Sequence, residues 1–263
     1  MTKKSFFIFL LISTLFTSCI PIKDLVYLQD KNNSVEQNTN TISAVESKPY
    51  RLQVNDVLSI SIKAIDPKLV SIFNTTASTT GKTESALYFD GFTVDDHGNI
   101  RMPVLGEINV IGYTLDEVRI RIEKKLLEEY FKSEADIFVT VKLAGFRYTI
   151  NGEVGSTGTK TLFQEHVNIM EAIANAGDIN TVGDRKTVTV IRQTPTGVQM
   201  NNIDLTDVNV MKSPYYYLQP NDYIYVKPLR QKTWGTGQTG IQSIGTIITL
   251  LSLATTVYLI IKN

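Results

Sequence analysis

The stretch LQVNDVLSI at residues 52–60 is matched in character, position by position, by LQPNDYIYV at residues 218–226. In both, an Asn-Asp pair precedes alternating apolar residues, which is the period of a half-buried strand. Asn and Asp side chains bond to the nearby backbone and so favour turns. The repeat therefore predicts two equivalent structural turns that each start a strand, and it does not indicate an active site. The four turn residues are Asn55, Asp56, Asn221 and Asp222.

Residues 49–144, around the first turn, read as one small α+β unit. Strand-like stretches lie on both sides of a polar turn at residues 95–99. Thr114 stands three residues before Glu117, and this spacing predicts a capping box at the start of a helix. Apolar residues then recur at helical spacing, and residues 137–143 alternate as a further strand.

Residues 145–230 predict a second α+β unit with a β-grasp pattern. Alternating residues and glycine turns come first, and Asn168 then caps a helix that ends at Gly177, a typical position for a C-terminal glycine. Strands at residues 187–192 and 198–205 follow. We therefore predict an α+β fold with two small domains in tandem.

The N-terminus has the parts of an export signal. Two lysines precede an apolar run that is too short to span a bilayer, and small residues then lead to Cys19. The stretch LFTSC at residues 15–19 resembles a bacterial lipobox, so we expect residues 1–18 to be removed and Cys19 to be lipidated. A buried free cysteine or an ordinary signal cleavage nearby is the alternative. We predict that residues 19–48 are a lipidated N-terminus and a flexible tether, because polar residues dominate 30–48. Residues 24–28 alternate weakly and are a candidate docking strand.

The C-terminus contains a second membrane signal. Residues 241–261 contain no charged side chain and, as a helix, reach roughly 30 Å, about one hydrocarbon core. Residues 231–240 read as a linker. We predict a transmembrane helix at 241–261, with polar residues gathered on one side. These give the pore-lining candidates Gln242, Thr246, Thr249, Ser252 and Thr256.

This polar stripe has three interpretations. Ser and Thr hydroxyls can bond back to carbonyls of their own helix. Small polar residues can also mark a contact between helices. The third interpretation is a helix with one face toward lipid and one toward water, which requires several copies in a ring because a single helix encloses no pore.

Composition and motifs argue against nucleic-acid binding and against common enzyme chemistry. Lys plus Arg equals Asp plus Glu, at 26 each, so nothing favours a nucleic-acid partner. His97 and His166 are the only histidines, and no zinc spacing, phosphate loop or nucleophile–base pair occurs. We therefore predict no cofactor, no metal site and no enzymatic activity. Paired carboxylates far apart in the sequence stay open, and Tyr215–Tyr217 are either a sugar-stacking surface or ordinary sheet surface.

Motifs in both units resemble one known family. The turn at residues 52–56, the stretch from Val94 through Gly98 to Gly106, and the helix from Thr114 resemble the polysaccharide export domain. INGEV at residues 150–154 and EAIANAG at residues 171–177 resemble the soluble-ligand-binding β-grasp domain. Their order, with a lipobox and an apolar C-terminus, is similar to that of the outer-membrane polysaccharide export lipoproteins.

The resemblance implies a ring-shaped homo-oligomer in the periplasm, held at the outer membrane by lipid, whose C-terminal helices form a barrel. Capsular or extracellular polysaccharide would leave through its lumen. Its implied partners are the polysaccharide, outer-membrane lipid, copies of itself, and an inner-membrane polysaccharide co-polymerase or tyrosine kinase. A single β-grasp repeat implies a short vestibule. The alternatives are a periplasmic glycan-binding lipoprotein with an anchor helix and a polysaccharide-modifying enzyme.

Overall fold

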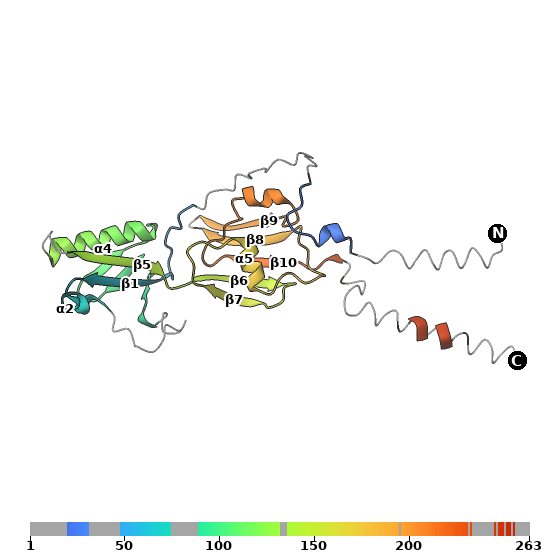
Figure 1. Cartoon of the computed structure of the whole chain (residues 1–263), viewed down its shortest axis with the longest axis horizontal. Coiled ribbons are helices and arrows are strands. Elements are labelled where there is room, and N and C mark those ends of the chain that lie inside the picture. Colours follow the sequence, from blue (N-terminus) through green and yellow to red (C-terminus); the bar gives the residue numbers. More distant parts are fainter. Residues whose placement is uncertain are drawn as a thin grey trace. The chain divides into compact units, whose positions relative to one another are not determined.

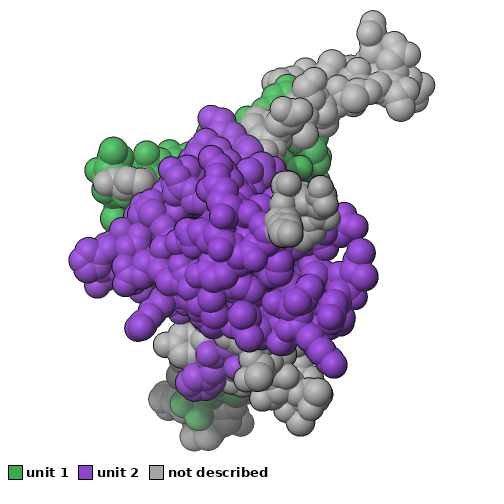
Figure 2. All heavy atoms as spheres, turned by 90° about the vertical axis from the view of Figure 1, so that its left-hand side faces the viewer, with its two compact units in different colours: residues 1–45, 148–160, 168–263 green, residues 46–147, 161–167 purple. Residues whose placement is uncertain are grey.

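The computed structural model describes residues 20–31, 48–74, 89–131, 136–194, 196–230 and 232, together with residues 245, 247–249, 251–253 and 255. The chain forms two compact units, drawn in different colours in Figure 2. Unit 1 comprises residues 1–45, 148–160 and 168–263, and unit 2 comprises residues 46–147 and 161–167. The predicted signal peptide and Cys19 lie outside the described residues.

Unit 2 is built on a three-stranded antiparallel sheet in the order β2-β1-β5. Helix α4 lies along this sheet (Figure 1), and its buried residues Val118, Ile122 and Leu126 recur at helical spacing. A β3-β4 hairpin completes the unit. The elements are β1 (Val57–Ala64), α2 (Pro67–Val70), η2 (Ser71–Phe73), β2 (Phe92–Thr93), β3 (Asn99–Met102), β4 (Gly106–Asn109), α4 (Leu115–Glu129) and β5 (Ile137–Leu143).

The core of unit 2 forms because every second residue of β1 faces inward. Leu58, Ile60 and Ile62 are buried between Val57 and Lys63, as a strand with one covered face requires. Helix α4 begins where the sequence predicted. The Thr114 hydroxyl accepts from the Glu117 amide at 3.2 Å, and the Glu117 carboxylate accepts from the Thr114 amide at 2.8 Å.

Unit 1 is built on a five-stranded mixed sheet in the order β7-β6-β10-β8-β9. The last strand, β10, lies in the middle, parallel to β6 and antiparallel to β8. Helix α5 accompanies this sheet (Figure 1). The elements are η1 (Ile22–Asp24), β6 (Phe146–Gly152), β7 (Gly158–Leu162), α5 (Ile169–Asn175), β8 (Val188–Thr194), β9 (Gly197–Ile203), η3 (Val208–Lys212) and β10 (Tyr223–Val226).

Two buried features hold α5 and the central strands of unit 1 together. The Tyr148 hydroxyl donates to the Ala172 carbonyl at 2.8 Å and to Asn175 Oδ1 at 3.0 Å, which joins β6 to α5. Gly152 has φ +99°, and a Cβ there would lie 1.9 Å from the Val226 carbonyl oxygen. Only glycine allows β6 and β10 to approach so closely at this point.

The α+β class predicted from the sequence is confirmed. Within the part of the chain that the structure describes, no helix has the length and apolar character needed to cross a membrane. Most of the predicted helix at 241–261 lies outside the described residues. Residues 161–167 group with unit 2. The predicted division into 49–144 and 145–230 placed them in the second domain instead.

Candidate functional site

The segment of residues 20–31, which we call the N-terminal strap, lies on unit 1. Its backbone joins the segment after β9: the Leu28 amide donates to the Leu205 carbonyl at 3.0 Å and the Gln29 amide to the Thr206 carbonyl at 2.8 Å. The Val208 amide returns a bond to the Gln29 carbonyl at 3.1 Å. These bonds form a short parallel bridge between Gln29 and Asp207.

Side chains reinforce the strap along its length. Lys186 Nζ donates to Asp24 Oδ1 at 2.5 Å, and Lys31 Nζ donates to Asp204 Oδ2 at 2.6 Å. Between these ion pairs the Tyr27 hydroxyl donates to Asp178. The guanidinium carbon of buried Arg185 lies 5.2 Å from the centre of the Tyr27 ring, within the range of a cation–π contact.

The protonation equilibria of the strap reflect this packing. Burial, followed by the hydrogen bond to Asp178, raises the pKa of Tyr27 to about 12. The hydrogen bond to Asp24 raises the pKa of Lys186. Burial acts to raise the pKa of Asp204, but hydrogen bonds from Lys31 and Thr206 outweigh it and hold that pKa below its usual value.

Residues 20–31 are docked on unit 1, in line with the candidate docking strand at 24–28, whereas residues 32–47, most of the predicted tether, lie outside the described residues. The docking has a physical cause. The strap is held by Asp178, Lys186 and Asp204, more than 150 positions along the chain, and local composition does not reveal such partners. As a result, the predicted lipidation residue Cys19 directly precedes a segment that is fastened to unit 1.

The two predicted Asn-Asp turns have the same geometry. Asn55 and Asn221 both adopt positive φ, at 70° and 67°. In each turn the carboxylate accepts a backbone N–H from three residues earlier at 2.8 Å, Gln53 for Asp56 and Gln219 for Asp222. Each turn leads into a strand, β1 or β10, as the sequence repeat indicated.

Their buried carboxylates have different partners. The Tyr50 hydroxyl donates to Asp56 at 2.8 Å. Asp222 instead meets the guanidinium of Arg192 in a bidentate pair, with Nε–Oδ1 at 2.9 Å and Nη2–Oδ2 at 2.6 Å. Burial raises the pKa of Asp222, and the bonds from Arg192 and the Gln219 amide oppose that shift. Sequence reasoning missed Arg192, because nothing in a single sequence pairs positions 192 and 222.

Two of the tyrosines at 215–217 bond to other residues of unit 1. The Tyr215 hydroxyl donates to Gln199 Oε1 at 2.8 Å, and the Arg192 guanidinium carbon lies 5.0 Å from the centre of the Tyr215 ring. The Tyr217 carbonyl accepts from Arg192 at 3.1 Å. The three tyrosines lie between η3 and β10, outside the strands, and Tyr217 forms an isolated bridge with Asn168.

Of the pore-lining candidates, Thr249 and Ser252 belong to the described residues, and Gln242, Thr246 and Thr256 do not. Thr249 and Ser252 are helical and exposed. Their hydroxyls donate to the Gly245 carbonyl at 3.1 Å and the Thr249 carbonyl at 2.9 Å. Both hydroxyls therefore bond to the helix backbone, which is one of the three interpretations of the stripe.

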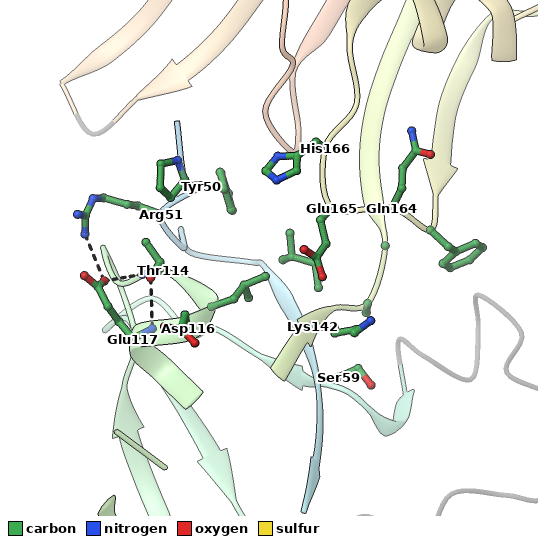
Figure 3. A pocket seen from close by; sticks show the side chains of 16 residues that line it. Tyr50, Arg51, Ser59, Thr114, Asp116, Glu117, Lys142, Gln164, Glu165 and His166 are labelled. Carbon is green, nitrogen blue, oxygen red and sulfur yellow. Dashed lines mark hydrogen bonds and ion pairs between the residues drawn. The ribbon is translucent and has the colours of Figure 1, made fainter. Parts of the chain in front are cut away.

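Unit 2 contains a cavity of about 840 Å³, within the ~300–1,000 Å³ range of small-ligand sites. Figure 3 shows Tyr50, Thr114 and Asp116 on one side and Lys142, Glu165 and His166 on the other. Sequence reasoning missed this cavity, because its walls come from separate segments. They are residues 49–51, Ser59, residues 114–117, residues 142–145 and residues 163–166.

Neither histidine belongs to a metal-binding cluster of the described residues. Within those ranges, no three His, Cys, Asp or Glu side chains gather where they could hold a metal ion. Asp95 instead accepts the amides of His97 and Asn99 at 2.9 and 2.8 Å, so the stretch around His97 is a hydrogen-bonded turn. The other histidine, His166, lines the cavity of unit 2.

Comparison with known proteins identifies the first domain. Residues 44–143 match the polysaccharide biosynthesis/export protein family. Proteins named EPS I polysaccharide export outer membrane protein EpsA, from Ralstonia nicotianae and Ralstonia solanacearum, are each 31% identical over 157 residues. The aligned stretch covers 56% of this chain but only 39% and 40% of the two relatives. Residues 44–143 therefore match the polysaccharide biosynthesis/export family, and the resemblance to polysaccharide export proteins predicted from the sequence is confirmed.

Proposed function

We propose that the protein is a subunit of an outer-membrane assembly that exports capsular or extracellular polysaccharide. The observation that carries this proposal is the polysaccharide biosynthesis/export domain at residues 44–143. The relatives that align with it are named as polysaccharide export outer membrane proteins. In this role the protein is a conduit and catalyses no reaction.

The N-terminal strap supports attachment of unit 1 to the membrane. A lipid on Cys19 would enter the inner leaflet of the outer membrane, at about 0.8 kcal/mol for each buried CH₂ group. The strap begins one residue later and is fastened by backbone bonds and two ion pairs. Unit 1 would therefore stay at the membrane surface, with most of the chain in the periplasm.

The apolar C-terminus supplies the proposed passage. Residues 241–261 contain no charged side chain, and several copies in a ring would enclose a channel that one copy cannot. The hydroxyls of Thr249 and Ser252 are uncharged and donate to carbonyls of their own helix. With Gln242, Thr246 and Thr256 they would present neutral hydrogen-bonding groups to a passing glycan, without the charges that trap a charged polymer.

Two experiments test this function. Removing residues 241–263 should abolish surface polysaccharide while the truncated protein stays lipidated and periplasmic. Full surface polysaccharide in that strain would contradict conduction through these helices. Particle images of the full-length protein in detergent should also show a closed ring with a central channel.

A periplasmic glycan-binding lipoprotein is the second candidate function, and the cavity of unit 2 is the observation that favours it. In that case the C-terminal segment only anchors the chain. Images of monomers or dimers without a channel, together with normal surface polysaccharide in a strain that lacks the protein, would favour binding over export.

A further inference from the structure

We infer that the cavity of unit 2 is a binding site for an uncharged segment of a saccharide chain. The inference deepens the proposed function and rests on it for the class of ligand. The cavity lies within a single unit, since every residue of its wall belongs to residues 46–147 or 161–167.

Regular secondary structure builds much of the cavity wall. Ser59 lies on β1, Thr114 to Glu117 form the capped start of α4, and Lys142 and Leu143 end β5. Tyr50 is fixed because its hydroxyl donates to buried Asp56 in the first Asn-Asp turn. The turn thereby orients one aromatic wall of the cavity.

An aromatic ring stands exposed at the cavity. The Phe163 side chain is 70% exposed although it is large and apolar. The Phe163 ring lies close to Gly145, just after the end of β5. A Cβ on Gly145 would lie 2.5 Å from Thr161 Cγ2 and 3.6 Å from the Phe163 ring. The apolar C–H face of a sugar ring suits an exposed aromatic ring of this kind.

Polar groups are available beside this ring. Among the described residues, no hydrogen-bonding or ionic partner contacts the side chains of Glu165 and Lys142, and Figure 3 shows both beside the cavity. A carboxylate accepts and an ammonium donates hydrogen bonds, so together they can bind the hydroxyl groups of a sugar. Arg51 is already engaged, with Gly112 at 2.7 Å and Glu117 at 3.4 Å.

The charges of the cavity wall favour an uncharged ligand. The wall contains two cationic side chains, Arg51 and Lys142, against three carboxylates, Asp116, Glu117 and Glu165. Two of those carboxylates stand in the first turn of α4, where they neutralise the positive end of the helix dipole. The cavity therefore lacks the positive potential that a polyanionic glycan needs, and an uncharged one fits it better.

The test is titration of the full-length protein in detergent with three tetrasaccharides, two uncharged (maltotetraose and chitotetraose) and one polyanionic (tetragalacturonate). At least one uncharged tetrasaccharide should bind saturably, and tetragalacturonate should bind more weakly. Phe163→Ala should weaken binding about tenfold, as expected for an aromatic contact of roughly 1.4 kcal/mol. Glu165→Gln should weaken it as well.

Phe138→Ala is the matched control. Phe138 is also in unit 2 and is 65% exposed, but it lies on β5 away from the cavity wall. This variant should bind like the wild type. Failure of both uncharged tetrasaccharides to bind, stronger binding of tetragalacturonate, or equal losses in Phe163→Ala and Phe138→Ala would overturn the inference.

The readout separates this inference from the proposed function. If the saccharides do not bind but a strain lacking the protein loses its surface polysaccharide, the cavity assignment fails and export stands. If an uncharged saccharide binds and that strain keeps its surface polysaccharide, the cavity assignment stands and export fails.

Discussion

The buried pair of Arg192 and Asp222 gives the sharpest prediction about stability. Asp222 is 1% exposed. Its carboxylate accepts hydrogen bonds from Nε and Nη2 of Arg192 and from the Gln219 amide. Asp222→Ala leaves the buried guanidinium of Arg192 without its carboxylate partner inside unit 1. Removing one partner of such a pair costs about 3–5 kcal/mol. We expect a loss of that size in the free energy of unfolding of unit 1.

The first turn provides a matched comparison within the same chain. Asp56→Ala removes the acceptor of the Gln53 amide and the Tyr50 hydroxyl, which are both neutral donors. The loss of two hydrogen bonds from neutral donors costs about 2 kcal/mol. Asp222→Ala should therefore be the more destabilising substitution, by roughly 2 kcal/mol, although both residues occupy the same place in the repeat.

Amide hydrogen exchange measures both effects in the intact protein, with β10 reporting on unit 1 and β1 on unit 2. Replacing both partners, in Asp222→Ala with Arg192→Leu, should recover part of the loss because no charge is then left buried. The reasoning is refuted if Asp222→Ala costs no more than Asp56→Ala, or if the double variant is less stable than Asp222→Ala alone.

Three further predictions concern the strap and the core of unit 1. Tyr27→Phe removes the bond to Asp178 and should speed amide exchange at residues 28 and 29, whereas unchanged exchange would mean that the bond does not hold the strap. Gly152→Ala should destabilise unit 1 by more than about 3 kcal/mol, because its Cβ would overlap the Val226 carbonyl; a thermal unfolding midpoint equal to that of the wild type would contradict this. Tyr27 and Tyr148 should ionise near pH 12 in an ultraviolet titration. Since an unfolded tyrosine has a pKa near 10, the stability they contribute is complete below about pH 10 and is lost as the pH rises toward 12, and ionisation of every tyrosine in one step near pH 10 would refute this.

Local signals predicted the parts of the fold that depend on local bonds. The capping boxes at Thr114 and Asn168 form within four residues of chain, so spacing alone reveals them. The repeated Asn-Asp turns are equally local, because each carboxylate bonds three residues back. The α+β class follows from the periodicities of the same segments.

Features that depend on distant partners escaped prediction. The weak alternation of residues 24–28 suggested docking, but only the positions of Asp178, Lys186 and Asp204 in the fold show where the strap is held. The wall of the cavity of unit 2 likewise combines segments more than 100 residues apart, such as those of Tyr50 and Phe163. A single sequence does not show which distant residues contact each other.

The central claim, export of a polysaccharide, is tested most directly by locating that polymer in a strain from which this protein alone has been deleted. If the protein is part of the outer-membrane conduit, surface polysaccharide should disappear, the polymer should accumulate inside the outer membrane, and the intact chain supplied in trans should restore the surface polymer. A deletion strain with wild-type amounts of polysaccharide at its surface would contradict the account.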